Sequence, residues 1–167
     1  MAKKTHIDQI INYTHEVISK IKSSKEVMGL IANNANIDLN DESSAQWESH
    51  IYDYDYIDDI PATAGAYIMV DTDVVKASSG TINDFEIYVQ VVCSKEYMTL
   101  SPSIFKGVKG NRRDNIAREV DLLLNKSNDF GIGQLELSSA RTATSPQGFT
   151  SKLLIYSIPD FSTNTRI

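Results

Sequence analysis

The chain has 167 residues, of which 41% are hydrophobic and 23% charged, values typical of one globular domain with its own core. No apolar run approaches the roughly 20 residues that cross a bilayer, and the N-terminal sequence lacks the apolar core and cleavage site of a signal peptide, so we expect no membrane partner. The single cysteine, Cys93, excludes an internal disulfide and is typical of a reducing compartment.

Charge is unevenly distributed along the sequence. The net charge is −6, yet residues 27–75 contain ten acids and no lysine or arginine, while the remainder carries 16 basic and 12 acidic residues. Five basic residues fall within 13 positions, namely Lys106, Lys109, Arg112, Arg113 and Arg118. The chain is therefore polarised along its sequence, with an acidic part followed by a basic part.

Two helices are predicted near the N-terminus. Thr5 and Asp8 have the spacing of a capping box. The serines at 23–24 predict the end of the first helix, Glu26 predicts the start of a second short one, and the asparagine-rich run 33–36 predicts its end. The apolar stripe of the first helix follows the 3.6-residue period and comprises Ile7, Ile10, Ile11, Ile18 and Ile21.

Residues 37–64 are predicted to form a long acidic loop with at most one short strand, at 50–54, because they lack hydrophobic periodicity. Loops of this length are more often functional than idle, and aromatic side chains are enriched in protein interfaces. We interpret the loop as a surface for a protein partner, with a strand whose tyrosines face the core as the alternative. The candidate contact residues are Asp53, Tyr54, Asp55, Tyr56, Asp58 and Asp59.

The rest of the chain predicts a sheet and one more helix. Strands at 66–74 and 81–94 flank the turn KASSG and are expected to pair antiparallel. A capped helix follows over 111–125, then two strands at about 132–142 and 149–158, and a polar tail at about 160–167. One face of the 81–94 strand carries Phe85, Ile87, Val89, Val91 and Cys93.

This order of elements predicts one α+β domain spanning residues 1–167. Its sheet is expected to be mostly antiparallel, with about four strands. The N-terminal helix and the central helix are expected to pack on that sheet, because each has one apolar face.

Neither a metal site nor a catalytic site is indicated by the sequence. An EF-hand needs a glycine at position six and a glutamate at position twelve, and the loop that starts at Asp53 has Asp58 and Ala64 there. Asp71 and Glu86 on adjacent strands resemble the acids of metal-dependent nucleases, but Tyr88 stands where those enzymes place a lysine. We expect no catalytic residue, cofactor or metal, and a small metal-dependent nuclease remains the alternative of another class.

The basic cluster could hold phosphates at a helix N-terminus. Asp114 already occupies that end, and the protein as a whole is acidic, so specific DNA binding is not expected. A solvated helix start and an acidic protein partner are the other interpretations. One such partner is a second copy, because a chain with an acidic and a basic part suits a head-to-tail contact that closes into a ring.

In this hypothesis residues 38–59 of one copy face Lys106 to Arg118 of the next. Reversing Arg112 and Arg113 to glutamate is then expected to abolish the ring while leaving the subunit folded.

Three phrases, "IPATAGAYIMVDTDVVKASSGTINDFEIYVQVVCSKE", "RRDNIAREVDLLLN" and "DFGIGQLELSS", together with the N-terminal helix and acidic loop, resemble small neck and tail-completion proteins of tailed bacteriophages. The resemblance is to the tail terminator, or head-tail joining, type and covers roughly residues 50 to 160. The resemblance rests on the order of the predicted elements and on the general similarity of these segments, because no diagnostic motif is present.

The resemblance implies a structural virion protein that is not an enzyme and uses no cofactor. Such proteins form a ring of six copies at the head-tail junction, cap the tail tube and join it to the neck. The implied partners are the protein itself, the tail tube protein and the neck or connector proteins, with DNA passing through unbound. The implied location is the virion, after assembly in the host bacterial cytoplasm. Another neck, tail-tube or baseplate component is the alternative within this class.

Overall fold

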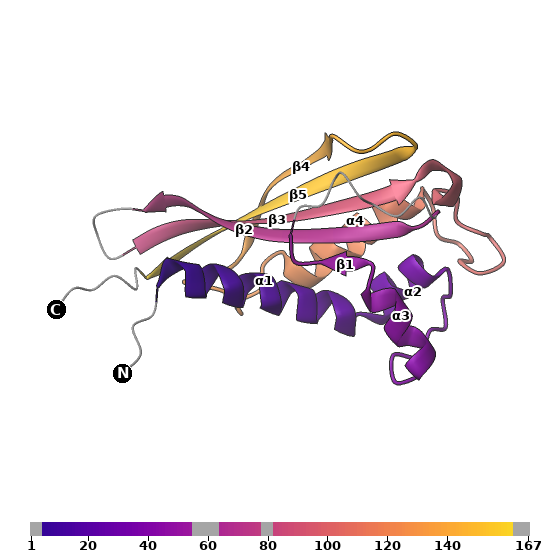
Figure 1. Ribbon diagram of the computed structural model, residues 1–167, viewed down its shortest axis with the longest axis horizontal. Helices are drawn as coiled ribbons and strands as arrows, with labels where there is room; N and C mark the ends of the chain where they lie inside the picture. Colours follow the sequence, from indigo (N-terminus) through magenta and orange to yellow (C-terminus); the bar gives the residue numbers. More distant parts are fainter. Residues whose placement is uncertain (1–4, 55–63, 78–81, 162–167) are drawn as a thin grey trace.

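The computed structural model describes residues 5–54, 64–77 and 82–161. Helices and strands alternate along the chain in groups, as an α+β fold requires (Figure 1). The helices are α1 (His6–Ser23), α2 (Lys25–Ala32), α3 (Ala45–Glu48) and α4 (Arg112–Leu124), with short 3-10 helices η1 (Glu42–Ser44) and η2 (Lys95–Tyr97). The strands are β1 (Ile51–Tyr52), β2 (Ala66–Ala77), β3 (Ile82–Ser94), β4 (Glu136–Ala143) and β5 (Phe149–Phe161).

The sheet has five strands in the order β1-β2-β3-β5-β4. β1 pairs parallel with β2 through Ile51 and Tyr52, and every other neighbouring pair is antiparallel. The predicted α+β class with a mostly antiparallel sheet is confirmed. The fifth strand is the two-residue β1, which coincides with the short strand expected at 50–54.

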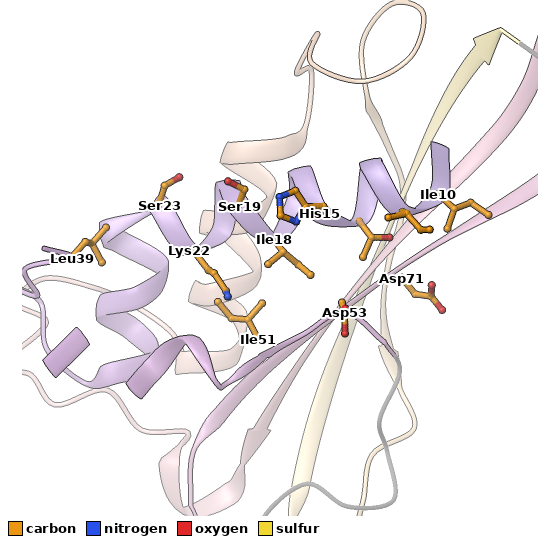
Figure 2. A pocket seen from close by; sticks show the side chains of 12 residues that line it. Ile10, His15, Ile18, Ser19, Lys22, Ser23, Leu39, Ile51, Asp53 and Asp71 are labelled. Atoms are coloured by element: carbon orange, nitrogen blue, oxygen red, sulfur yellow. The ribbon is translucent and has the colours of Figure 1, made fainter. Parts of the chain in front are cut away.

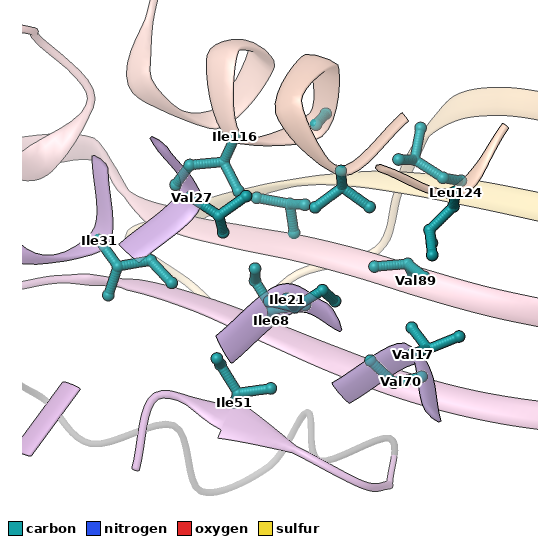
Figure 3. Close-up of a cluster of buried hydrophobic side chains, with 14 of the residues drawn as sticks. Val17, Ile21, Val27, Ile31, Ile51, Ile68, Val70, Val89, Ile116 and Leu124 are labelled. Carbon is teal, nitrogen blue, oxygen red and sulfur yellow. The ribbon is translucent and has the colours of Figure 1, made fainter. Parts of the chain in front are cut away.

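All the long helices pack against one face of this sheet (Figure 1). α1 lies along β2, and α4 crosses β3 and β5. The predicted inward face of β3 is confirmed, because Phe85, Ile87, Val89, Val91 and Cys93 are fully buried. Figure 3 shows how Val17 and Ile21 of α1 meet Ile68 and Val70 of β2, with Ile116 of α4 closing the cluster. Burial of this apolar surface is the main source of the fold's stability.

The helix boundaries follow local capping. The Thr5 side chain accepts from the Asp8 amide and the Asp8 side chain accepts from the Thr5 amide, so the predicted capping box is present. Ser24 ends α1 and caps α2 by accepting from the Val27 amide. α2 ends at Asn33, whose left-handed φ of 54° is tolerated by asparagine.

The predicted apolar stripe of α1 is wider than its buried face. Ile21 is fully buried, and Ile10 and Ile18 pack against the core. Ile7 and Ile11 are 61% and 59% exposed, so the expectation that they face the core is wrong. The helix contacts the sheet through the side that carries Thr14, Val17 and Ile21. Ile7 and Ile11 lie on a different side of the helix and remain exposed.

Residues 37–54 are more ordered than the predicted loop. They form η1, α3 and β1, with turns between them. Ile37 is buried, and Leu39 and Trp47 pack against the core. The apolar side chains are too widely spaced to show a period, which explains why the sequence predicted a loop. Residues 55–63, which complete that segment, lie outside the described residues.

Candidate assembly interface

A long groove runs between α1 and the edge of the sheet formed by β1 and β2 (Figure 2). Its volume is about 880 Å³. Its lining combines isoleucines from α1 and β1 with a histidine, a lysine and two aspartates. The lining residues include Ile10, Ile11, His15, Ile18, Lys22, Ile51, Asp53 and Asp71. This mixture of apolar and charged side chains is typical of a protein-protein contact.

The wall of the groove opposite α1 is a partly free strand edge. β1 pairs only with Ile68 and Met69 of β2. Within the described residues, no strand pairs with that side of β2 from Asp71 onward. The backbone N–H and C=O groups of this edge can therefore pair with another chain.

The opposite edge of the sheet is β4, and it is also open. β4 pairs with β5 on one side, and the sheet ends there among the described residues. Ala140, Arg141 and Thr142 on this strand are exposed. A second, smaller groove of about 240 Å³ separates β4 and β5 from α4, with Leu137, Ala140 and Arg118 in its lining. Within the described part of the chain, each edge of the sheet thus combines a strand with an open stretch and a groove beside a helix.

The face of the sheet away from the helices, here called the outer face, carries an acidic row. Asp73 lies directly opposite Glu86 in the β2–β3 register, and Asp71 lies opposite Tyr88. Like charges placed opposite one another on a sheet are destabilising. The Tyr88 hydroxyl donates to Glu86 Oε2 at 2.5 Å. This hydrogen bond, with burial and the nearby carboxylates, raises the pKa of Tyr88 to about 12.

This acidic row does not assemble into a metal centre. Among the residues that the structure describes, no three His, Cys, Asp or Glu side chains converge as ligands of an ion. Gln90 of β3 donates to the Thr144 carbonyl at 3.1 Å. Cys93 is fully buried, as predicted for a packed thiol, and burial raises its pKa to about 11.

The predicted contact residues of the acidic loop are only partly placed. Asp53 and Tyr54 are exposed and follow directly on β1, and Asp53 lines the groove (Figure 2). Tyr54 is 47% exposed and lies edge-on to Tyr52, with ring centroids 5.8 Å apart. The other four candidates, Asp55, Tyr56, Asp58 and Asp59, lie outside the described residues.

Arg112 is a structural clamp inside the subunit. Its side chain is 2% exposed, so the expectation that it belongs to a basic surface is wrong. Its Nε donates to the Tyr97 carbonyl at 2.7 Å, and its two Nη atoms donate to the Leu30 carbonyl and the Asn33 side-chain oxygen at 2.5 and 2.7 Å. The guanidinium also stacks on the Tyr97 ring, 4.0 Å from its centroid. Reversal of Arg112 would therefore disrupt the fold as well as any ring.

The other members of the basic cluster lie nearer the surface. Arg113 pairs with Asp114 at 2.9 Å and is largely buried, at 14% side-chain exposure. Arg118 pairs with Glu119 at 2.7 Å and is 58% exposed. Lys106 and Lys109 are exposed on the loop that precedes α4. Lys106, Lys109 and Arg118 are thus the cluster members best placed to meet a partner.

Sequence reasoning missed the two sheet edges and the groove along α1. Strand order determines an edge, and strand order is set by tertiary pairing. One signal was available, because a stripe of five isoleucines on α1 is wider than one sheet contact can bury. No helix among the described residues is long and apolar enough to cross a membrane.

Comparisons with known proteins identify the family and a similar fold. No curated protein sequence matches the chain. Among solved structures, it is similar to a chain from the virion of a native gene transfer agent (GTA) particle, with a TM-score of 0.54 and 12% sequence identity, over 87% of this chain and 92% of that chain. At this identity the likeness shows a shared fold. The YomW family model matches residues 24–158, and the chain therefore belongs to the YomW family.

Proposed function

We propose that this protein is a structural component of a virion, forming a ring at the head-tail junction that caps the tail tube and joins it to the neck. The observation that carries the proposal is the likeness of fold, over nearly the whole chain, to a chain of a gene transfer agent virion particle. The two open edges of the sheet support it further, because a ring needs two different contact surfaces on each copy.

In this proposal the ring contains six copies, and each copy contacts the next head to tail. Asp53 and Tyr54 at the β1 edge, with Lys106, Lys109 and Arg118 around α4, are the described residues proposed for this contact. Arg113 stands beside them but is largely buried. The candidates Asp55, Tyr56, Asp58 and Asp59 stay predictions, because they lie outside the described residues. Arg112 is left out, because it is buried within its own subunit. The tail tube protein and the neck proteins would meet the two flat faces of the ring.

The charge of the protein suits a passage for DNA. A ring built from subunits of net charge −6 would repel the phosphate backbone at its inner wall. In physiological salt this repulsion acts over about 8–10 Å. DNA would therefore pass without binding, and no cofactor or catalytic step is required.

The proposal is tested by deleting the gene from a phage that carries it. The expected result is DNA-filled heads separate from tails of uncontrolled length, and purified protein added to such a lysate should restore joined particles. In parallel, light scattering during size-exclusion chromatography should give a mass of several subunits, either alone or after addition of tails. Intact, infectious particles made without the protein would overturn the proposal.

A further inference from the structure

The unpaired stretch of β2 is flanked on both sides by features that limit its length. β1 pairs with Ile68 and Met69 of β2, and the pairing of β2 with β3 becomes irregular between Val74 and Lys76. Among the described residues, the regular part of β2 that no strand pairs on this side is therefore Asp71 to Val74. Ile11 of α1 lines the groove beneath this edge although it is 59% exposed. The Thr72 amide of this stretch donates to Asp71 Oδ1 at 2.8 Å, a local bond that pairing with another strand would replace. An edge strand above an exposed isoleucine still favours cover by another chain, because the edge carbonyls have no strand partner among the described residues and the isoleucine is exposed.

The free edge of β4 has a matching length. Its pairing with β5 is irregular between Leu137 and Ser139, and it is regular from Ser139 to Ala143. No lysine or proline blocks this stretch, which reads Ser-Ala-Arg-Thr-Ala. Ala140 and Thr142, which face the helix side, are small and exposed.

We propose that the two edges pair between copies, so that β4 of one subunit adds to β2 of the next and covers the groove along α1. The occupant is therefore a second copy of this chain. This inference rests on the proposed ring and names its contact surface. The strand directions allow it, because β2, β3, β5 and β4 are successively antiparallel. A neighbouring β4 consequently arrives antiparallel to β2 without any subunit being turned over.

The pleat of the sheet then fixes which side chains meet. Arg141 lies opposite Leu153, and Leu153 lies opposite Gln90, so Arg141 projects from the outer face. Asp71 and Asp73 project from the same face. Because side chains of paired residues share a face, a one-residue slip is excluded. Two registers remain. Arg141 opposite Asp73 pairs Ala143 to Ala140 with the whole stretch Asp71 to Val74, whereas Arg141 opposite Asp71 pairs only Arg141 to Ser139 with it and leaves Ala143 opposite Met69, where β1 already pairs.

These groups complement one another. Asp71 and Asp73 are exposed beside Glu86, which leaves an acidic row with mutual repulsion. Arg141 is exposed on the other edge. Its guanidinium would relieve that repulsion and set the register. On the helix side, Ala140 and Thr142 of the arriving strand would cover Ile11.

Paired cysteines test this contact directly. Opposed residues of antiparallel strands have Cα atoms about 4.5–5.5 Å apart, which is within disulfide range. We would prepare Asp71→Cys with Arg141→Cys, and Asp73→Cys with Arg141→Cys. Within one subunit β2 and β4 are separated by two strands, or about 14 Å, so any disulfide must join two copies. Mild oxidation should give a ladder of covalent oligomers for at least one pair.

The controls use the same strands. Asp71→Cys with Glu136→Cys places the thiols at least four positions out of register, because Arg141 pairs with Leu153 and Glu136 with Ser157. This separation is about 14 Å, so the control should give no ladder. The unmodified chain carries only Cys93, which is fully buried, and should also give none. A ladder in both cysteine pairs and in the out-of-register control would indicate random collision and would overturn the proposal.

Charge reversal gives a second readout on uncrosslinked protein. Arg141→Glu should lower the association constant at least tenfold, and adding Asp73→Arg or Asp71→Arg should restore it. Lys25→Glu, at an exposed position on α2, is the matched control and should leave association unchanged. If the protein assembles but Arg141→Glu has no effect and no ladder forms, the edge pairing is overturned while the ring proposal stands. If gene deletion leaves normal particles and the chain stays monomeric, both fail.

Discussion

At the scale of single residues, Arg112 shows how a charged side chain can belong to the interior. It reaches the last turn of α2, where unpaired carbonyls favour a cation. Burial lowers its pKa, but an arginine stays protonated at neutral pH. Its planar fork satisfies several carbonyl oxygens at once, and no other side chain has this geometry.

Replacing Arg112 by methionine should therefore destabilise the subunit strongly. The variant keeps the apolar stem but leaves the carbonyls of Leu30 and Tyr97 without their donor, at a cost of about 3 kcal/mol. Arg112→Lys should recover only part of this loss, because an ammonium group cannot match the fork. Urea unfolding followed by circular dichroism measures both.

Arg118→Met is the matched control, because that arginine is exposed and its ion pair among the described residues is with its neighbour Glu119. Surface ion pairs of this kind contribute about 0–1 kcal/mol. If the Arg112 and Arg118 variants unfold at the same urea concentration as the native chain, the clamp has no energetic role.

At the scale of elements, the start of α4 combines a cap with a charge network. The Asn111 side chain accepts from the Asp114 amide, and Asp114 accepts from Asn111 and Arg113 and lies 3.6 Å from Lys152 of β5. Burial acts to raise the pKa of Asp114, but these hydrogen bonds and charges outweigh it, and the pKa lies below its usual value.

Asp114→Asn should consequently lower stability at pH 7 and have less effect in acid. A depressed carboxyl pKa stabilises the fold above the unfolded value, about 3.9 for aspartate, and this contribution disappears as the pH falls through the folded pKa. We expect a loss of about 0.5–1 kcal/mol at pH 7, shrinking toward zero near pH 2. Unfolding curves for both proteins from pH 7 to pH 2 would measure it, and a gap that does not change with pH would contradict this explanation.

The elements also differ in how far the sequence predicted them. The alternation along β3 and the capping box of α1 are local patterns, and both were predicted within a residue or two. β4 starts at Glu136, later than predicted, because residues 126–135 are held in a turn by hydrogen bonds between Lys126, Ser127 and Leu135. The order of residues 37–54 depends on Trp47 and Ile37 packing against distant elements, and such contacts leave no period in the sequence.

The candidate interface was harder to predict than the fold. Composition directed attention to charged residues, but charge alone could not separate Arg112, which is buried, from Arg118, which is exposed. Strand order determines the proposed contact role of Arg141, Asp71 and Asp73, because only the topology places Arg141 and the two aspartates at opposite edges of one sheet. Local sequence does not encode which strand will be the edge.

At the scale of the whole molecule, the proposed pairing of the sheet edges would account for one isoleucine that α1 leaves exposed. Ile11 lies on the groove side of the helix, under the free part of β2. In a monomer this side chain contributes little to stability. In an assembly in which a neighbouring β4 covers the groove, it becomes part of a buried contact, and burying an isoleucine contributes about 1.5–3 kcal/mol.

Ile11→Gln should therefore separate folding from assembly. The free energy of unfolding of the subunit should change by no more than about 0.5 kcal/mol, as for most exposed positions. The association constant should fall about tenfold or more, since each 1.4 kcal/mol corresponds to a factor of ten. Leu122→Gln on α4 is the matched control, because Leu122 is more exposed, at 71%, and does not line the groove. Sedimentation velocity over a concentration series measures association for both variants, and an equal effect of the two substitutions would show that apolar exposure in general, and not the groove at the β2 edge, drives the subunits together.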